Sequence, residues 1–255
     1  MDVYDRLAHR TQGRGRTILY IAGAVVAAAI LLSIYSWWST RRANEAQLAL
    51  GKAIEIAAAP VVTGTPQPGE TGPTFPNERE RAQKAIEEFQ KVQNNFGAPY
   101  NDMARYFVAV NLLTVDRNKG LSELDALGKG GNGEVASRAK FALAQAKESD
   151  NQYDAAAALY KELAQDKNKP ISDNTLNLRL ASVYEKQDKK DEAVGILFAM
   201  VEASRKEQQG KEAEGKTPNE SSAIRAAAEK LQTLSPERYA QLPPEPVAKN
   251  APPAF

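Results

Sequence analysis

The strongest constraint in this sequence is an uncharged stretch of 22 residues, 17–38, which reads TILYIAGAVVAAAILLSIYSWW. A helix of that length rises about 33 Å, and the hydrocarbon core of a bilayer is about 30 Å thick. Aromatic side chains stand near both ends of the stretch, where spanning helices carry interfacial anchors: Tyr20, Tyr35, Trp37 and Trp38. The stretch therefore predicts one transmembrane helix.

Two other readings of this stretch are a cleaved signal peptide and a buried core helix. A signal peptide has an apolar region of about 7–15 residues followed by small residues at the cleavage site. Here the run is longer, its small residues 27–29 lie inside it, and Trp37-Trp38 and Arg41-Arg42 follow. A core helix rarely stays uncharged over this length. We interpret 17–38 as an uncleaved anchor.

The orientation of the anchor rests on the distribution of positive charge. Four arginines lie in the tail 1–16, and three basic residues lie within a similar distance on the other side: Arg6, Arg10, Arg14 and Arg16 against Arg41, Arg42 and Lys52. Basic residues favour the cytoplasmic side of a span. The expected topology is single-pass, with 1–16 cytoplasmic and the C-terminal domain exported. In a bacterium this means an inner-membrane protein with a periplasmic domain.

Composition removes many kinds of chemistry. The 255 residues contain no cysteine and one histidine, His9, which lies in the N-terminal tail. Disulfides, zinc fingers, thiol nucleophiles and histidine-based catalytic triads are therefore excluded from the exported part. With 33 basic and 32 acidic residues, the chain lacks the strong positive charge of a nucleic-acid-binding protein. We expect no catalytic residue, metal, cofactor, small-molecule substrate or nucleic-acid partner.

The exported part is predicted to be all-α, because helix-forming residues dominate and apolar residues recur every three to four positions. Small residues recur at longer intervals, with Ala109, Ala144 and Ala181 spaced 35 and 37 apart. Twelve residues after the last two come Ala156 and Ala193, each followed four positions later by a bulky residue, Tyr160 or Leu197. This pattern resembles the tetratricopeptide repeat, in which paired helices approach closely at small side chains.

The repeat pattern defines the expected domain organisation. Residues 41–203 are predicted to form tetratricopeptide-like helical repeats, stacked as an α-solenoid directly after the anchor. In the first unit Leu50-Gly51…Ile54 is assigned to the first helix, and Ala85…Phe89…Val92 to the second, with a Pro/Gly-rich insertion at 60–77 between them. Three segments follow the repeats: a polar loop at 204–221, a C-terminal capping helix at 222–234 and a disordered Pro-rich tail at 243–255.

A candidate peptide-binding groove follows from the register of the small residues. The first helices of successive repeats are expected to project eight side chains onto one concave face: Tyr106, Val110, Arg138, Phe141, Gln145, Leu178, Ser182 and Glu185. Such a mixture of aromatic, aliphatic and charged residues suits an extended or helical peptide. Alternatively, these residues pack against the C-terminal helix or the Pro-rich insertion.

Three segments carry a resemblance to a known family: ANEAQLALGKAIEIA after the two tryptophans, FGAPYNDMARYFVAVNLL at 96–113 and NTLNLRLASVYEKQDKKDEAVGIL at 174–197. In this order and spacing the chain resembles the membrane-anchored tetratricopeptide proteins typified by the ancillary subunit of the bacterial Sec translocon. The resemblance implies an inner-membrane protein that contacts the SecYEG channel and periplasmic chaperones and has no catalytic activity.

Two other functions remain open from sequence. One keeps the scaffold and changes the partner, as in an assembly factor for a cytochrome-maturation, secretion or cell-division complex. The other is an envelope enzyme that uses carboxylates, which would need an Asp/Glu pair converging in one deep pocket.

Overall fold

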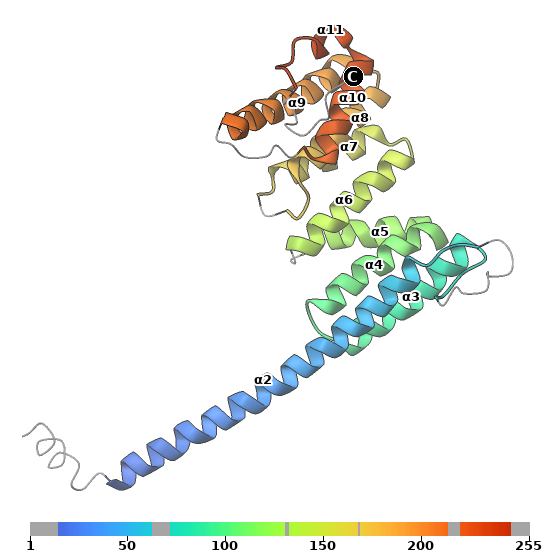
Figure 1. The fold of residues 1–255 in the computed structure, drawn as a ribbon. Helices are drawn as coiled ribbons and strands as arrows, with labels where there is room; N and C mark the ends of the chain where they lie inside the picture. Colours follow the sequence, from blue (N-terminus) through green and yellow to red (C-terminus); the bar gives the residue numbers. More distant parts are fainter. Residues whose placement is uncertain (1–14, 63–71, 131–132, 168, 214–219, 246–255) are drawn as a thin grey trace, which may run out of the picture.

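The computed structural model describes residues 15–62, 72–130, 133–167, 169–213 and 220–245. These residues form a row of helices on a long N-terminal stem (Figure 1). The helices are α2 Gly15–Ala57, α3 Glu78–Asn95, α4 Tyr100–Val115, α5 Arg117–Gly128, α6 Gly133–Ser149, α7 Tyr153–Gln165, α8 Asp173–Lys186, α9 Lys190–Ala213, α10 Ser222–Leu234 and α11 Pro236–Tyr239. The protein is thus all-helical over the described residues, as the sequence predicts.

Helix α2 joins the apolar N-terminal segment to the folded domain without a break. Its part from Tyr20 to Ala57 is long and apolar enough to cross a membrane, and every side chain from 20 to 38 is exposed. Beyond Arg42 the same helix packs against α3. The tail 1–14 lies outside the described residues, so its predicted cytoplasmic placement is a sequence-based expectation only.

Consecutive helices pack against one another throughout the domain, from α2 on α3 to α9 on α10. Short turns connect α4 to α5, α6 to α7 and α8 to α9. Two of these turns contain a residue with positive φ, Asn151 between α6 and α7 and Asp188 between α8 and α9. Asn and Asp tolerate this left-handed conformation better than most residues, which explains why the helices reverse there.

The predicted small positions lie where helices cross. Five alanines have no exposed surface: Ala109, Ala144, Ala156, Ala181 and Ala193. Each pair separated by twelve residues lies in one apolar cluster, Ala144 with Ala156 and Ala181 with Ala193. The bulky residues expected four positions later, Tyr160 and Leu197, are also fully buried. The predicted register of these two helix pairs is confirmed.

In the first pair both predicted helices are present, as the second part of α2 and as α3. Gly51 is exposed, and a methyl group built on it would meet nothing within 4 Å, so it lies at no helix crossing. Ala53 is fully buried and packs with Ala85 and Phe89 of α3. The small residue at the crossing of this pair is therefore Ala53, and Gly51 lies on the exposed side of the helix.

The second pair uses a glycine that the sequence analysis did not single out. A Cβ placed on Gly120 of α5 would lie 2.7 Å from the backbone nitrogen of Leu113 in α4. No real side chain fits at that distance, so the two backbones approach closely only because Gly120 lacks one. Gly120 follows Ala109 by eleven residues, whereas the predicted pattern places the second small residue twelve residues after the first.

The Pro/Gly-rich insertion 60–77 is closed at its base. Val62 N–H donates to the Phe75 carbonyl at 2.9 Å, and Phe75 N–H donates to the Pro60 carbonyl at 3.1 Å. Asn77 then caps α3, its side chain accepting from the N–H of Glu80. The two ends of the predicted insertion are thus paired with each other, and residues 63–71 between them lie outside the described residues.

The C-terminal region differs from the prediction in two places. A polar loop is expected at 204–221, but α9 continues to Ala213 because Arg205 and Gln208 face the interior and are 5% exposed. The disordered tail is expected from 243, but Arg205 donates to the Pro243 carbonyl and forms an ion pair with Glu245 at 2.8 Å. The capping helix predicted at 222–234 is present as α10.

Candidate partner-binding face

Helices α4 and α6 pack side by side and bring the first predicted residues together. Tyr106 and Val110 of α4 lie one helical turn apart, and both are partly buried against a core of α4, α5 and α6 residues. Burial raises the pKa of Tyr106, while the charge of Arg138 on α6 opposes this rise. Tyr106 also stacks at a tilted angle on Phe107 of the same helix, with ring centroids 5.2 Å apart.

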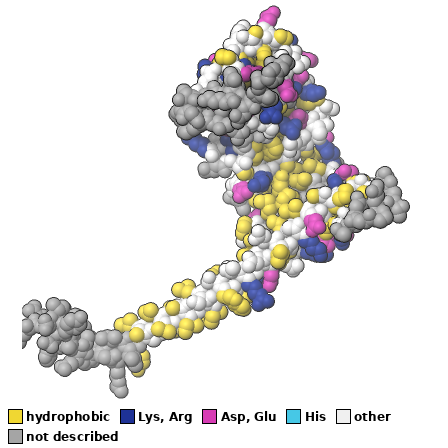
Figure 2. Space-filling view, in the orientation of Figure 1, with side chains coloured by type: hydrophobic (Ala, Val, Ile, Leu, Met, Phe, Trp, Pro, Cys, Tyr) yellow, Lys and Arg dark blue, Asp and Glu magenta, His cyan; other side chains and the backbone are white. Residues whose placement is uncertain are grey.

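The residues predicted on α6 are partly exposed and have identified neighbours. Arg138 Nη2 lies 2.9 Å from Glu134 Oε1 one turn earlier on the same helix. The ring of Phe141 packs at a tilted angle on Tyr160, with centroids 5.8 Å apart. In Figure 2 apolar side chains gather over the middle of the domain, where α4 and α6 lie. The predicted face is therefore apolar in its central part, with Arg138 beside it.

The residues predicted on α8 have a different environment, because the C-terminal helix packs against this part of the array. Leu178 contacts the cluster that contains Ile224 and Leu231 of α10. Glu185 forms an ion pair with Lys230 of α10. Ser182, which lies between these two residues in the sequence, is partly buried. The alternative in which predicted residues pack against the C-terminal helix thus describes Leu178 and Glu185.

A buried polar contact that the sequence analysis missed joins α6, α7 and α8. Tyr160 of α7 is fully buried, and its hydroxyl donates to Glu148 Oε2 of α6 at 3.0 Å. Arg179 of α8 lies 3.9 Å from the other oxygen of Glu148. Burial, followed by the negative charge of Glu148, raises the pKa of Tyr160. The sequence offered one sign of this contact: a tyrosine at a bulky core position. A buried tyrosine hydroxyl usually has a hydrogen-bond partner.

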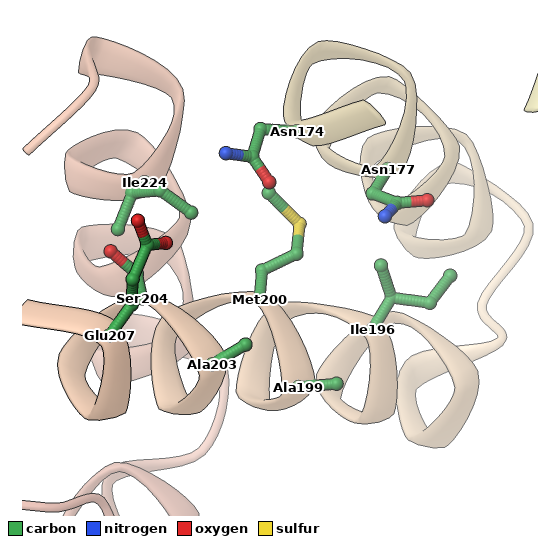
Figure 3. A pocket seen from close by; sticks show the side chains of 9 residues that line it. All are labelled: Asn174, Asn177, Ile196, Ala199, Met200, Ala203, Ser204, Glu207 and Ile224. Atoms are coloured by element: carbon green, nitrogen blue, oxygen red, sulfur yellow. The ribbon is translucent and has the colours of Figure 1, made fainter. Parts of the chain in front are cut away.

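A cavity of about 370 Å³ lies between α8, α9 and α10, next to the cluster on which the predicted residue Leu178 packs (Figure 3). Asn174 and Asn177 of α8 form one side, and α9 supplies most of the other. The lining residues are Asn174, Asn177, Ile196, Ala199, Met200, Ala203, Ser204, Glu207 and Ile224. None of the eight predicted residues is among them. The two asparagines one turn apart were the available sequence signal, but polar residues at a helix start are common on exposed surfaces.

The charged groups around these sites do not converge on a metal-binding arrangement within the part of the chain that the structure describes. The cavity in Figure 3 is lined by a single carboxylate, Glu207. No family model and no curated protein matches this chain.

Proposed function

We propose that this protein is a non-catalytic scaffold, anchored in a membrane by α2, that binds a segment of a partner protein on the face of α4 and α6. The observation that carries the proposal is the partly exposed aromatic and aliphatic surface of two adjacent first helices, with Tyr106, Val110 and Phe141 beside Arg138. Partly buried aromatic side chains next to an arginine are frequent at the centres of protein interfaces.

The helical pairs are proposed to form a tetratricopeptide-type solenoid. The buried alanines that recur after 35 and 37 residues support this assignment, as does the packing of each helix on its neighbours in sequence. In such an array the first helices line one continuous surface, which suits an extended or helical peptide. Leu178, Ser182 and Glu185 would then lie at the end of the surface that α10 covers.

The proposed location is a bacterial inner membrane, with the N-terminus cytoplasmic and the domain periplasmic. The arginines of the tail 1–16 support this orientation. Protease digestion of intact spheroplasts tests it, because an exported domain is degraded from outside. A C-terminal domain that stayed protected until the membrane was permeabilised would contradict the orientation.

The proposed partners are the SecYEG channel and periplasmic chaperones, on the basis of the family resemblance in the sequence. A photoreactive amino acid placed at Tyr106 or Phe141 in the native host should crosslink to one of them. Ala158, an exposed residue of α7, provides the matched control on a second helix. Equal crosslinking from Ala158 would contradict the proposed face. Crosslinks from Tyr106 to subunits of a cytochrome-maturation, secretion or division complex would instead support the assembly-factor alternative.

A further inference from the structure

The turn between α3 and α4, residues 96–99, lies beside α2 at the point where its apolar segment ends. Arg42 of α2 donates from Nη2 to the carbonyl of Asn95 at 2.7 Å, and its guanidinium lies over the ring of Phe96, 5.4 Å from the centroid. Because α3 runs antiparallel to α2, with Arg81 bonded to the Ala59 carbonyl at the other end, this turn is the end of the first pair nearest the apolar segment (Figure 1).

The position of this turn along the bilayer normal follows from the geometry of α2. Arg42 comes four residues after Trp38, which corresponds to about 6 Å along a helix. Trp37 and Trp38 are 64% and 56% exposed, and tryptophans at the end of a span lie at the level of the lipid headgroups. The headgroup layer extends about 5–8 Å beyond the hydrocarbon core on each side. A turn held against Arg42 is therefore at headgroup depth.

The surface of the turn has the chemistry of an interfacial segment. Residues 94–101 read NNFGAPYN and carry no charged side chain. Gly97, Ala98 and Pro99 are exposed, and the flanking Phe96 and Tyr100 are partly buried. Arg41, the residue before Arg42, is exposed on α2, with its guanidinium over the ring of Trp37 and 3.6 Å from Glu45. Aromatic residues and arginine around a small uncharged turn match the mixed polar and apolar headgroup layer.

We propose that residues 96–99, which Arg42 holds against α2, form a second membrane contact inserted among the lipid headgroups. The contact holds the domain at two points, the span and the turn, and so sets its tilt on the bilayer. This inference rests on α2 spanning the membrane. It is independent of which partner binds the face of α4 and α6.

The absence of cysteine makes a direct test possible, because one introduced cysteine is the only site for a thiol-reactive fluorophore. The full chain carrying Ala98→Cys is labelled with an environment-sensitive dye and reconstituted into phosphatidylcholine–phosphatidylglycerol vesicles. The matched control is Ala58→Cys, an exposed alanine sixteen residues beyond Arg42, about 24 Å further along the helix axis. Some vesicles contain lipid with a nitroxide on its headgroup.

The dye at Ala98 is expected to shift to shorter wavelength on reconstitution and to lose fluorescence in the nitroxide vesicles, whereas the dye at Ala58 should do neither. Aqueous iodide should quench Ala58 more than Ala98. Fluorescence of the two native tryptophans reports the span separately. Quenching of the tryptophans without quenching at Ala98 would overturn the second contact and leave the anchor intact. Unquenched tryptophans would overturn the anchor itself, and the second contact with it.

Discussion

Along α2, the side chains from 20 to 38 are all exposed, whereas Ala46, Ala53 and Ile56, further along the same helix, are at most 8% exposed. The backbone conformation is the same in both parts, so helix propensity cannot account for the difference. The distribution of apolar residues accounts for it. Apolar residues surround the whole helix in the first part and lie on one face in the second. An all-round apolar surface suits lipid, and a single apolar face suits a protein core.

The sharpest test of this contrast removes one aromatic side chain from each environment. Phe89 packs on the α3-facing side of α2, and its ring stacks on that of Phe107 with centroids 4.8 Å apart. Phe89→Ala is expected to lower the free energy of unfolding by about 3–5 kcal/mol through the cavity it leaves. Trp37→Ala should leave it unchanged. Urea titration of the full chain in detergent micelles, followed by far-UV circular dichroism, measures both. Equal losses would mean that the apolar segment also packs on the domain.

A charge placed in the middle of the exposed apolar segment tests the other part of α2. Ala28→Arg should make membrane insertion less favourable by about 2.5–3.5 kcal/mol, because the arginine must be taken from water into the bilayer. Alkaline extraction of membranes should release more of this variant than of Ala28→Leu. The urea midpoint of the domain should stay the same in both. A shift in that midpoint would break the division of α2 into two independent parts.

Two substitutions two residues apart in α2 should have opposite effects on stability. Ala53→Leu adds volume at a fully buried helix crossing and is expected to cost about 1–3 kcal/mol of unfolding free energy. Gly51→Ala should stabilise the protein by about 0.5–1 kcal/mol, since its methyl group meets nothing and the helix gains a better former. Thermal unfolding of the two variants decides the register of the first helix pair. A destabilised Gly51→Ala would mean that Gly51, and not only Ala53, lies against a neighbouring helix.

The smallest expected effect is at the boundary between the two parts. Arg42→Ala removes the hydrogen bond to the Asn95 carbonyl and the contact with the Phe96 ring, which together stabilise the folded state by about 1 kcal/mol. Hydrogen exchange should become faster at the C-terminal amides of α3 while remaining unchanged in α8. The matched variant Arg41→Ala, whose side chain contacts only α2 residues in the described interactions, should leave α3 unaffected.

The positions of the helices and of most core alanines could be predicted from the sequence, because both depend on local patterns. Ala144, Ala156, Ala181 and Ala193 are buried as expected, since a fixed spacing brings them to the same crossing. Gly120 was missed because its role is visible only from the distance between two backbones. Gly51 shows the converse, because a small residue marks a crossing only on the inner side of a helix.

The candidate face could be predicted less completely than the helices. Tyr106 and Val110 lie partly buried against one core cluster of α4, α5 and α6 residues, one helical turn apart as their spacing implies. For Glu185 the outcome depended on the C-terminal helix, whose Lys230 lies 45 residues away in sequence. Arg205 was assigned to a loop because it is charged, yet Tyr239 and Glu245 satisfy its guanidinium inside the fold. A sequence pattern gives the face on which a residue lies, but not the distant partner that covers it.

Because α2 is unbroken, the number of residues between Trp38 and Arg42 sets how far the domain is rotated about the helix axis relative to the apolar segment. Each residue in a helix turns the chain by about 100° and advances it by about 1.5 Å. One residue added between the two would therefore rotate the whole domain by about 100° around the axis of the stem. Four added residues would return it to within about 40° of its original bearing and lift it by about 6 Å. With α2 spanning a membrane as proposed, the number of residues in this short stretch of helix sets the direction in which the proposed α4–α6 face points relative to the bilayer.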